Sequence, residues 1–175
     1  TPKVAVGDSV TVTGTVSEYV PGGASTGNQS LTEITKPTVT VLSSGNAVPA
    51  ATVIDAKSVP ALYTPAGDTA ASGSVNGLTL DPAKYALDYY ESLEGMNVQV
   101  ADARVVTATD PYTELWVTVK PYENANRRGG SVYGSYTSQN TGRLQIQSLG
   151  STADFPAANV GDTLKGTTAG PLDYN

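Results

Sequence analysis

Strict alternation of apolar and polar residues recurs along this chain and constrains its fold more than any other feature. In residues 10–16, valines occupy the even-numbered positions and threonines the odd-numbered ones, apart from a glycine at position 14. The same period of two is found in residues 38–41, 114–120 and 143–147. Successive side chains of a β-strand point to opposite faces, so each segment is predicted to be a strand with one buried face.

Two further stretches complete a mostly-β plan. Leu31–Leu42 reads as a strand region with a break at Lys36-Pro37, and Met96–Thr107 reads as a long strand. Gly14 is predicted to mark a bulge or a tight bend, because glycine inside a strand favours a local irregularity. We therefore predict an all-β fold, with OB-fold-like Greek-key barrel modules as the specific architecture.

One helix is expected, in the segment DPAKYALDYYESLEG. Asp81 can cap its first turn, Pro82 suits its first position, and Gly95 suits the position after its end. An apolar stripe at a spacing of four residues would face the core, and it consists of Tyr85, Tyr89 and Leu93.

A short phrase occurs twice, once near each end of the chain. Val6-Gly7-Asp8 precedes the first alternating strand, and Val160-Gly161-Asp162 precedes the last one. If both strands are the fourth of a five-stranded barrel, residues 1–60 are the C-terminal strands of a first OB-like module. Residues 61–80 are then a linker, and residues 81–175 are a second module without its last strand, so a fragment of a longer chain is expected. The alternative is a duplication within a single sandwich.

Two absences from the composition exclude several kinds of active site. The 175 residues contain no Cys and no His. Thiolate nucleophiles, Cys-rich metal sites and every His-dependent catalytic constellation are therefore impossible. Paired carboxylates remain, but a non-catalytic module is the favoured interpretation. No run approaches 18 apolar residues, so no membrane span is expected.

Several quoted segments carry a family resemblance that covers most of residues 4–55 and 81–175. They are VGDSVTVTGTVSEY, LTEI, TVTVLSSGNAVPA, ALDYYESLEGMNVQVADARVV, TELWV, NTGRLQIQ and NVGDTLKGTTAGPLDYN. Together they resemble the OB-fold region of large secreted bacterial nucleases. The most specific phrase is Tyr90–Met96, YESLEGM.

That resemblance implies that this chain is one part of a larger protein, whose catalytic domain is a separate part. In such nucleases these modules precede a DNase I-like endonuclease/exonuclease/phosphatase domain, often beside lamin-tail-like domains. The implied parent is a secreted, extracellular bacterial enzyme that uses a divalent metal. Its catalytic residues would lie outside this chain, so we expect no catalytic residue, cofactor or metal site here. The implied partners are the catalytic domain of the same polypeptide and DNA or RNA.

The basic residues of this acidic chain, whose net charge is -6, are concentrated in one region. Residues 120–143 contain four basic residues and one acidic residue, Glu123, so this region has a local charge of +3. Arginines that neutralise phosphates, interleaved with tyrosines that stack on bases, suit single-stranded nucleic acid. The candidate binding residues are Lys120, Tyr122, Arg127, Arg128, Tyr133, Tyr136 and Arg143. A solvated hairpin loop is the plainer interpretation.

Trp116, the only tryptophan, is a candidate stacking platform, although it could also cover the barrel. Glu91 and Glu94 could be paired carboxylates, but an exposed polar face explains them better. Two alternative functions stay open. One is a purely structural spacer of an extracellular or cell-surface protein, and the other is a carbohydrate-binding β-module that uses Trp116 and Tyr136.

Overall fold

The computed structural model describes residues 3–26, 29–65, 78–135 and 138–174 of this chain. It divides into two compact units, the first built on residues up to Ala50 and the second on Ala51–Ala66 and Thr79–Asp173. The boundary thus lies at Ala50, whereas the sequence suggested one at residue 60. The reason is that residues 52–60 supply a strand and core side chains to the second unit. No described helix has the length and apolar character required to cross a membrane.

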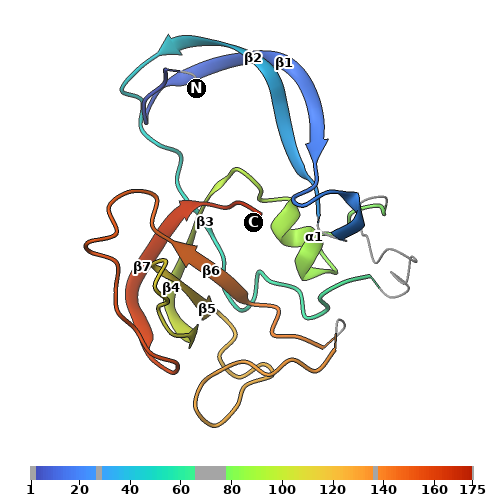
Figure 1. The fold of residues 1–175 in the computed structure, drawn as a ribbon, viewed down its shortest axis with the longest axis vertical. Helices are drawn as coiled ribbons and strands as arrows, with labels where there is room; N and C mark the ends of the chain where they lie inside the picture. Colours follow the sequence, from blue (N-terminus) through green and yellow to red (C-terminus); the bar gives the residue numbers. More distant parts are fainter. Residues whose placement is uncertain (1–2, 27–28, 66–77, 136–137, 175) are drawn as a thin grey trace. The chain divides into compact units, whose positions relative to one another are not determined.

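The second unit contains an open five-stranded sheet (Figure 1). Its long strand β4 pairs antiparallel with β7 along one edge, and with β5 antiparallel and β3 parallel on the other; β6 follows β5. No ladder joins β6 to β7 in the described residues, so no closed barrel is formed. The strands are β3 (Thr52–Val53), β4 (Asn97–Thr107), β5 (Glu114–Thr118), β6 (Arg143–Gln147) and β7 (Thr163–Pro171).

The core of this unit lies on one face of the sheet, and it confirms the alternation read from the sequence. Leu115 and Val117 of β5 are fully buried, and so is Val105 of β4. The opposite, outer face of β5 carries Glu114 and Trp116, which are partly exposed, and Thr118, which is buried. The other fully or largely buried apolar residues of this cluster are Ile54, Val59, Ala86, Leu93, Val98, Val100, Ala103 and Ala158.

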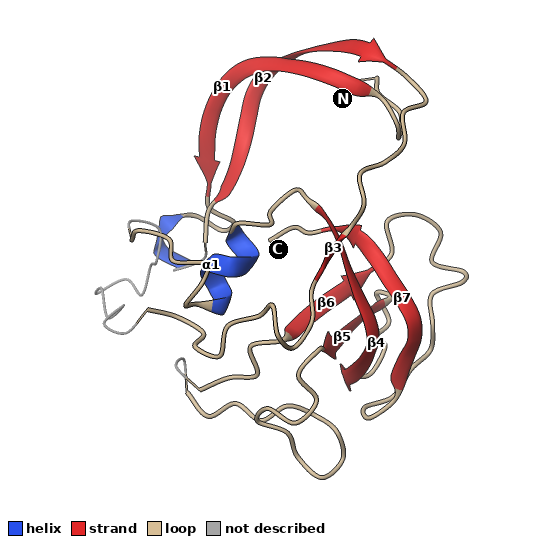
Figure 2. Ribbon diagram, turned by 180° about the vertical axis from the view of Figure 1, so that it is seen from behind, coloured by secondary structure: helices blue, strands red, loops and turns tan. Residues whose placement is uncertain are grey.

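Helix α1 (Ala86–Glu91) forms where a helix was expected but is shorter (Figure 2). Asp81 does not cap it: Tyr85 occupies the N-cap, and the Asp81 N–H instead donates to the Asp88 carboxylate at 2.7 Å. Gly95 follows the helical turn with a φ of 71°, as predicted for a glycine after the end. The predicted apolar stripe is confirmed, because Tyr85 and Leu93 are buried and Tyr89 packs against the core.

The first unit contains a two-stranded antiparallel sheet of β1 (Ser9–Tyr19) and β2 (Leu31–Ser43), with a short 3-10 turn at Ala24–Thr26. Gly14 marks a register shift, which confirms the predicted bulge. A Cβ at this position would lie 2.7 Å from the Thr35 carbonyl oxygen. β2 runs from Leu31 to Ser43, but Lys36 and Pro37 have no partner in β1 and Lys36 has a φ of +50°, so the expected break is present as an irregularity in the pairing. The expected buried face was wrong, because β1 is exposed along both faces and these two strands have no covering layer among the described residues.

The repeated phrase adopts one local structure in both places. Asp8 donates its N–H to the Ala5 carbonyl and accepts the Ala5 N–H on its side chain, at 3.0 and 2.8 Å. Asp162 makes the same two bonds with Asn159, at 3.1 and 2.8 Å. The intervening glycines have φ values of 91° and 96°, which only glycine adopts at little cost. Val-Gly-Asp therefore encodes a tight turn that starts a long strand.

Candidate nucleic-acid interface

The basic segment between β5 and β6 is an ordered hairpin in its central part, residues 124–132 (Figure 1). The Val132 N–H donates to the Asn124 carbonyl at 2.6 Å, and the Asn126 N–H donates to the Gly130 carbonyl at 2.9 Å. At the tip, the Asn126 side-chain oxygen accepts the N–H groups of Arg128 and Gly130 at 2.9 and 3.1 Å. The tip holds Arg127 and Arg128 exposed to solvent.

The hairpin tip packs tightly on the second Gly-Asp turn. A Cβ added to Gly129 would lie 2.8 Å from the Gly161 Cα, and one added to Gly161 would lie 2.8 Å from the Arg128 carbonyl oxygen. The Gly161 N–H in turn donates to the Val105 carbonyl at 2.9 Å. Glycines at both positions therefore allow the basic tip to rest beside β4.

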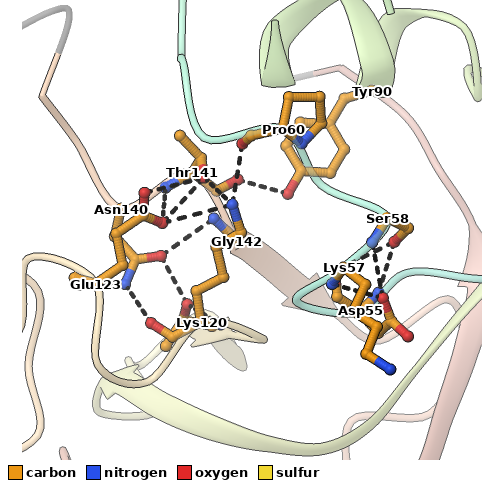
Figure 3. Close-up of polar contacts among 11 residues, drawn as sticks. Asp55, Lys57, Ser58, Pro60, Tyr90, Lys120, Glu123, Asn140, Thr141 and Gly142 are labelled. Carbon is orange, nitrogen blue, oxygen red and sulfur yellow. Dashed lines mark hydrogen bonds and ion pairs between the residues drawn. The ribbon is translucent and has the colours of Figure 1, made fainter. Parts of the chain in front are cut away.

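A buried polar network holds the two ends of the segment together (Figure 3). The Asn140 side chain donates to the carbonyl oxygens of Lys120 and Glu123 at 2.9 and 2.7 Å. Its oxygen accepts the Thr118 hydroxyl at 2.7 Å and the Gly142 N–H at 3.1 Å. Asn140 is only 6% exposed; its bonds to Thr118 and Gly142 are buried, and those to Lys120 and Glu123 are partly buried. The network therefore fixes where the hairpin leaves and rejoins the sheet.

Lys120 belongs to this network. Its ammonium group donates to the Thr141 hydroxyl at 2.7 Å and to the Pro60 carbonyl at 3.0 Å, and it lies 3.9 Å from a Glu123 carboxylate oxygen. Burial lowers the pKa of Lys120, and the Glu123 charge opposes that shift. Its side chain is 11% exposed, so its charge is directed inward and supports the hairpin base.

Helix α1 joins the network through Tyr90. The Tyr90 hydroxyl donates to the Thr141 carbonyl at 2.7 Å, and burial raises the pKa of this phenol well above its ordinary value. Thr141 also donates to the Glu123 carboxylate from both its N–H and its hydroxyl, at 3.0 and 2.9 Å. Gly142 has no room for a side chain, because a Cβ would lie 2.9 Å from Lys120 and from Val119. The helix, the sheet and the hairpin base are thus tied together.

On the outer face of the sheet, basic residues of two strands lie on either side of a buried residue, Thr118. Arg104 of β4 lies opposite Thr118 of β5, which lies opposite Arg143 of β6, and residues opposite each other share a face. The Arg143 guanidinium lies 5.1 Å from the centre of the Trp116 ring, and the Arg104 guanidinium lies 6.0 Å from that of Tyr122. Both are within the range of cation–π attraction.

Arg104 was missed by the sequence reasoning. From sequence alone, a charged residue at an outward-facing strand position is expected simply to be exposed to solvent. Only the pairing of β4 with β5 places Arg104 beside the basic hairpin. Trp116 is half-buried, and the Arg143 guanidinium lies against its ring.

The remaining candidates differ in their surroundings. Tyr122 and Tyr133 are 89% and 61% exposed, whereas Tyr136 lies outside the described residues. Glu114, the acidic residue of β5 on the outer face, accepts hydrogen bonds from the side-chain amides of Gln145 and Gln147. Glu91 is the last residue of α1, and Glu94 lies in the turn that follows it. In the described part of the chain, no cluster of three or more metal-ligating residues occurs.

Comparison with known proteins gives one family. Searches of curated proteins and of solved structures found no match. A family model described as a domain of unknown function (DUF8508) matches residues 53–175, which is well over half of the chain and includes all of β4 to β7. The chain therefore belongs to the DUF8508 family.

Proposed function

We propose that this chain is a non-catalytic accessory β-module of a secreted bacterial nuclease, which positions nucleic acid for a catalytic domain of the same polypeptide. One observation carries the proposal. Two cation–aromatic pairs, Arg104 with Tyr122 and Arg143 with Trp116, lie on the outer side of the sheet that also supports the hairpin. The exposed Arg127 and Arg128 extend this basic and aromatic surface at the hairpin tip.

The chemistry of these groups suits a single-stranded polynucleotide. Guanidinium groups neutralise phosphates and release counterions, and aromatic rings stack on bases whatever their sequence. Each stacked base contributes about 1–3 kcal/mol in known examples. Binding would thus be tolerant of sequence and steeply dependent on salt. In this proposal, bond cleavage belongs to a separate metal-dependent domain.

The strand order supports an OB-like interpretation of the second unit. A long strand paired with β7 on one edge and with β5 and then β6 on the other is the arrangement of four strands of a five-stranded Greek-key barrel. In the same interpretation, β1 and β2 are strands of a preceding OB-like module. Proteins with this fold commonly bind oligonucleotides on the sheet face and adjacent loops.

Charge reversal at the hairpin tip tests the proposal. We would measure fluorescence anisotropy of labelled single-stranded DNA with the wild-type chain and with the Arg127→Glu, Arg128→Glu variant. A matched control is Lys57→Glu with Lys165→Glu, because it changes the net charge equally at exposed lysines of the same unit. The proposal predicts loss of binding in the tip variant and much less in the control. Equal binding by both variants would refute the tip assignment.

A further inference from the structure

The Arg104 side chain leaves a polar atom without a partner inside the protein. Its Nε is buried and has no hydrogen-bond partner among the described residues. The ion pairs found there, Lys120 with Glu123 and Lys165 with Asp102, do not include it. Buried polar atoms nearly always have a partner, since desolvation without one is costly. This donor therefore suits an oxygen-bearing, anionic ligand.

Two residues of the segment between β5 and β6 lie against Arg104. The Tyr122 ring lies against the Arg104 guanidinium. Gly129 of the hairpin tip lies near the Arg104 side chain, because a Cβ added to Gly129 would be 3.6 Å from the Arg104 Cδ. Ser131, on the return strand of the same hairpin, carries a second buried polar atom without a partner, its hydroxyl oxygen. Tyr122 itself is 89% exposed, so its ring covers little of the guanidinium.

Charged residues of both signs lie on the elements packed around this position. Arg127 and Arg128 are exposed at the tip above it. Of the carboxylates on the packed elements, Asp162 accepts the Asn159 N–H at 2.8 Å, and Asp102 is paired with Lys165 at 3.9 Å. Each of these acids is therefore engaged by a group other than Arg104.

We propose that Arg104, beneath the hairpin, forms a phosphate-binding subsite of this surface. A guanidinium presents its Nε and one Nη as a fork that matches two oxygens of a phosphate. Arg127 and Arg128 would contact neighbouring phosphates, while Tyr122 stacks on a base. The inference rests on the proposed function, because the phosphate is taken to be part of a polynucleotide backbone.

The test separates polynucleotide phosphate from free phosphate. In one arm, the affinity for labelled oligothymidylate is measured across a salt series for the wild type, Arg104→Gln and the control Lys165→Gln, whose lysine is 83% exposed. Loss of one phosphate contact on a single strand should reduce the log–log salt slope by about 0.7 and weaken binding roughly tenfold at low salt. The control should change the affinity less than about twofold. In the second arm, thermal unfolding is followed with inorganic pyrophosphate against chloride at equal ionic strength.

The outcomes distinguish the subsite from the proposed function. A reduced slope in Arg104→Gln, together with loss of pyrophosphate stabilisation, supports both. Pyrophosphate stabilisation that needs Arg104, with no DNA binding by the wild type, supports the subsite and refutes the proposed function. DNA binding by Arg104→Gln with an unchanged slope overturns the subsite alone. Arg104→Lys keeps the charge without the fork and should be intermediate, which guards against a folding defect in the glutamine variant.

Discussion

Replacement of Asn140 by alanine tests whether the buried network holds the basic hairpin in place. The variant loses bonds to the Thr118 hydroxyl, the Gly142 N–H and the carbonyl oxygens of Lys120 and Glu123. A hydrogen bond contributes about 1 kcal/mol net, so four bonds give an upper value of about 4 kcal/mol. A water molecule that enters the space left by the amide recovers part of this. We expect the free energy of unfolding to fall by about 3 kcal/mol, with a decrease in Tm of about 10 °C.

Urea denaturation followed by Trp116 fluorescence is the appropriate assay, because the only tryptophan of the chain lies on β5 in the second unit. Asn126→Ala is the matched control, because the Asn126 side chain also bonds to the backbone, where it accepts two N–H groups, but at the exposed hairpin tip. We expect that variant to lose less than about 1 kcal/mol. A loss below about 1 kcal/mol for Asn140→Ala, or equal losses for the two variants, would refute the network's structural role.

Three further predictions concern the same unit. Gly161→Ala should lower the free energy of unfolding by about 1–3 kcal/mol and weaken DNA binding, because it places a side chain at a positive φ and against the Arg128 carbonyl. The control Gly170→Ala, whose Cβ would meet no atom within 4 Å, should change that free energy by less than about 0.5 kcal/mol. Tyr90→Phe should lose about 1–2 kcal/mol in urea denaturation, since it removes the bond to Thr141, and an unchanged midpoint would contradict this. Hydrogen bonds from the N–H groups of Ser58 and Lys57 lower the pKa of Asp55 below its ordinary 3.8, so its contribution to stability is present above that pH and is lost as the pH falls through the folded value. Asp55→Asn should flatten the acid limb of the stability curve, as measured by Trp116 fluorescence, and an unaltered limb would count against the assignment.

Local patterns predicted the parts of the fold that depend on local rules. The alternation in β5 and β6 follows from burial of one sheet face, and Gly95 and Gly14 mark conformations that side chains disfavour. The sequence could locate strand β3 only coarsely, as a short extended piece within residues 46–59, because its two residues carry no periodicity and its pairing with β4 is long-range. The capping role given to Asp81 was wrong, since the competing bond from its N–H to Asp88 organises that turn differently.

The candidate site could be predicted only in part, because its parts meet through contacts far apart in sequence. The basic and tyrosine-rich composition pointed to the hairpin as a candidate site. Nothing in the sequence near Lys120 indicates that its ammonium group donates hydrogen bonds to Pro60 and Thr141. Arg104 gave no local signal, because its position beside Tyr122 depends on how the hairpin folds back over β4.

The central claim is that this acidic chain binds single-stranded nucleic acid through a local basic and aromatic surface. The most direct measurement is fluorescence anisotropy of labelled single- and double-stranded DNA with the wild-type chain, at about 50 and about 200 mM salt. We expect micromolar binding to the single strand at the lower salt, weaker binding to the duplex, and a steep loss at the higher salt. Absence of binding to the single strand at the lower salt would contradict it and leave the module a spacer.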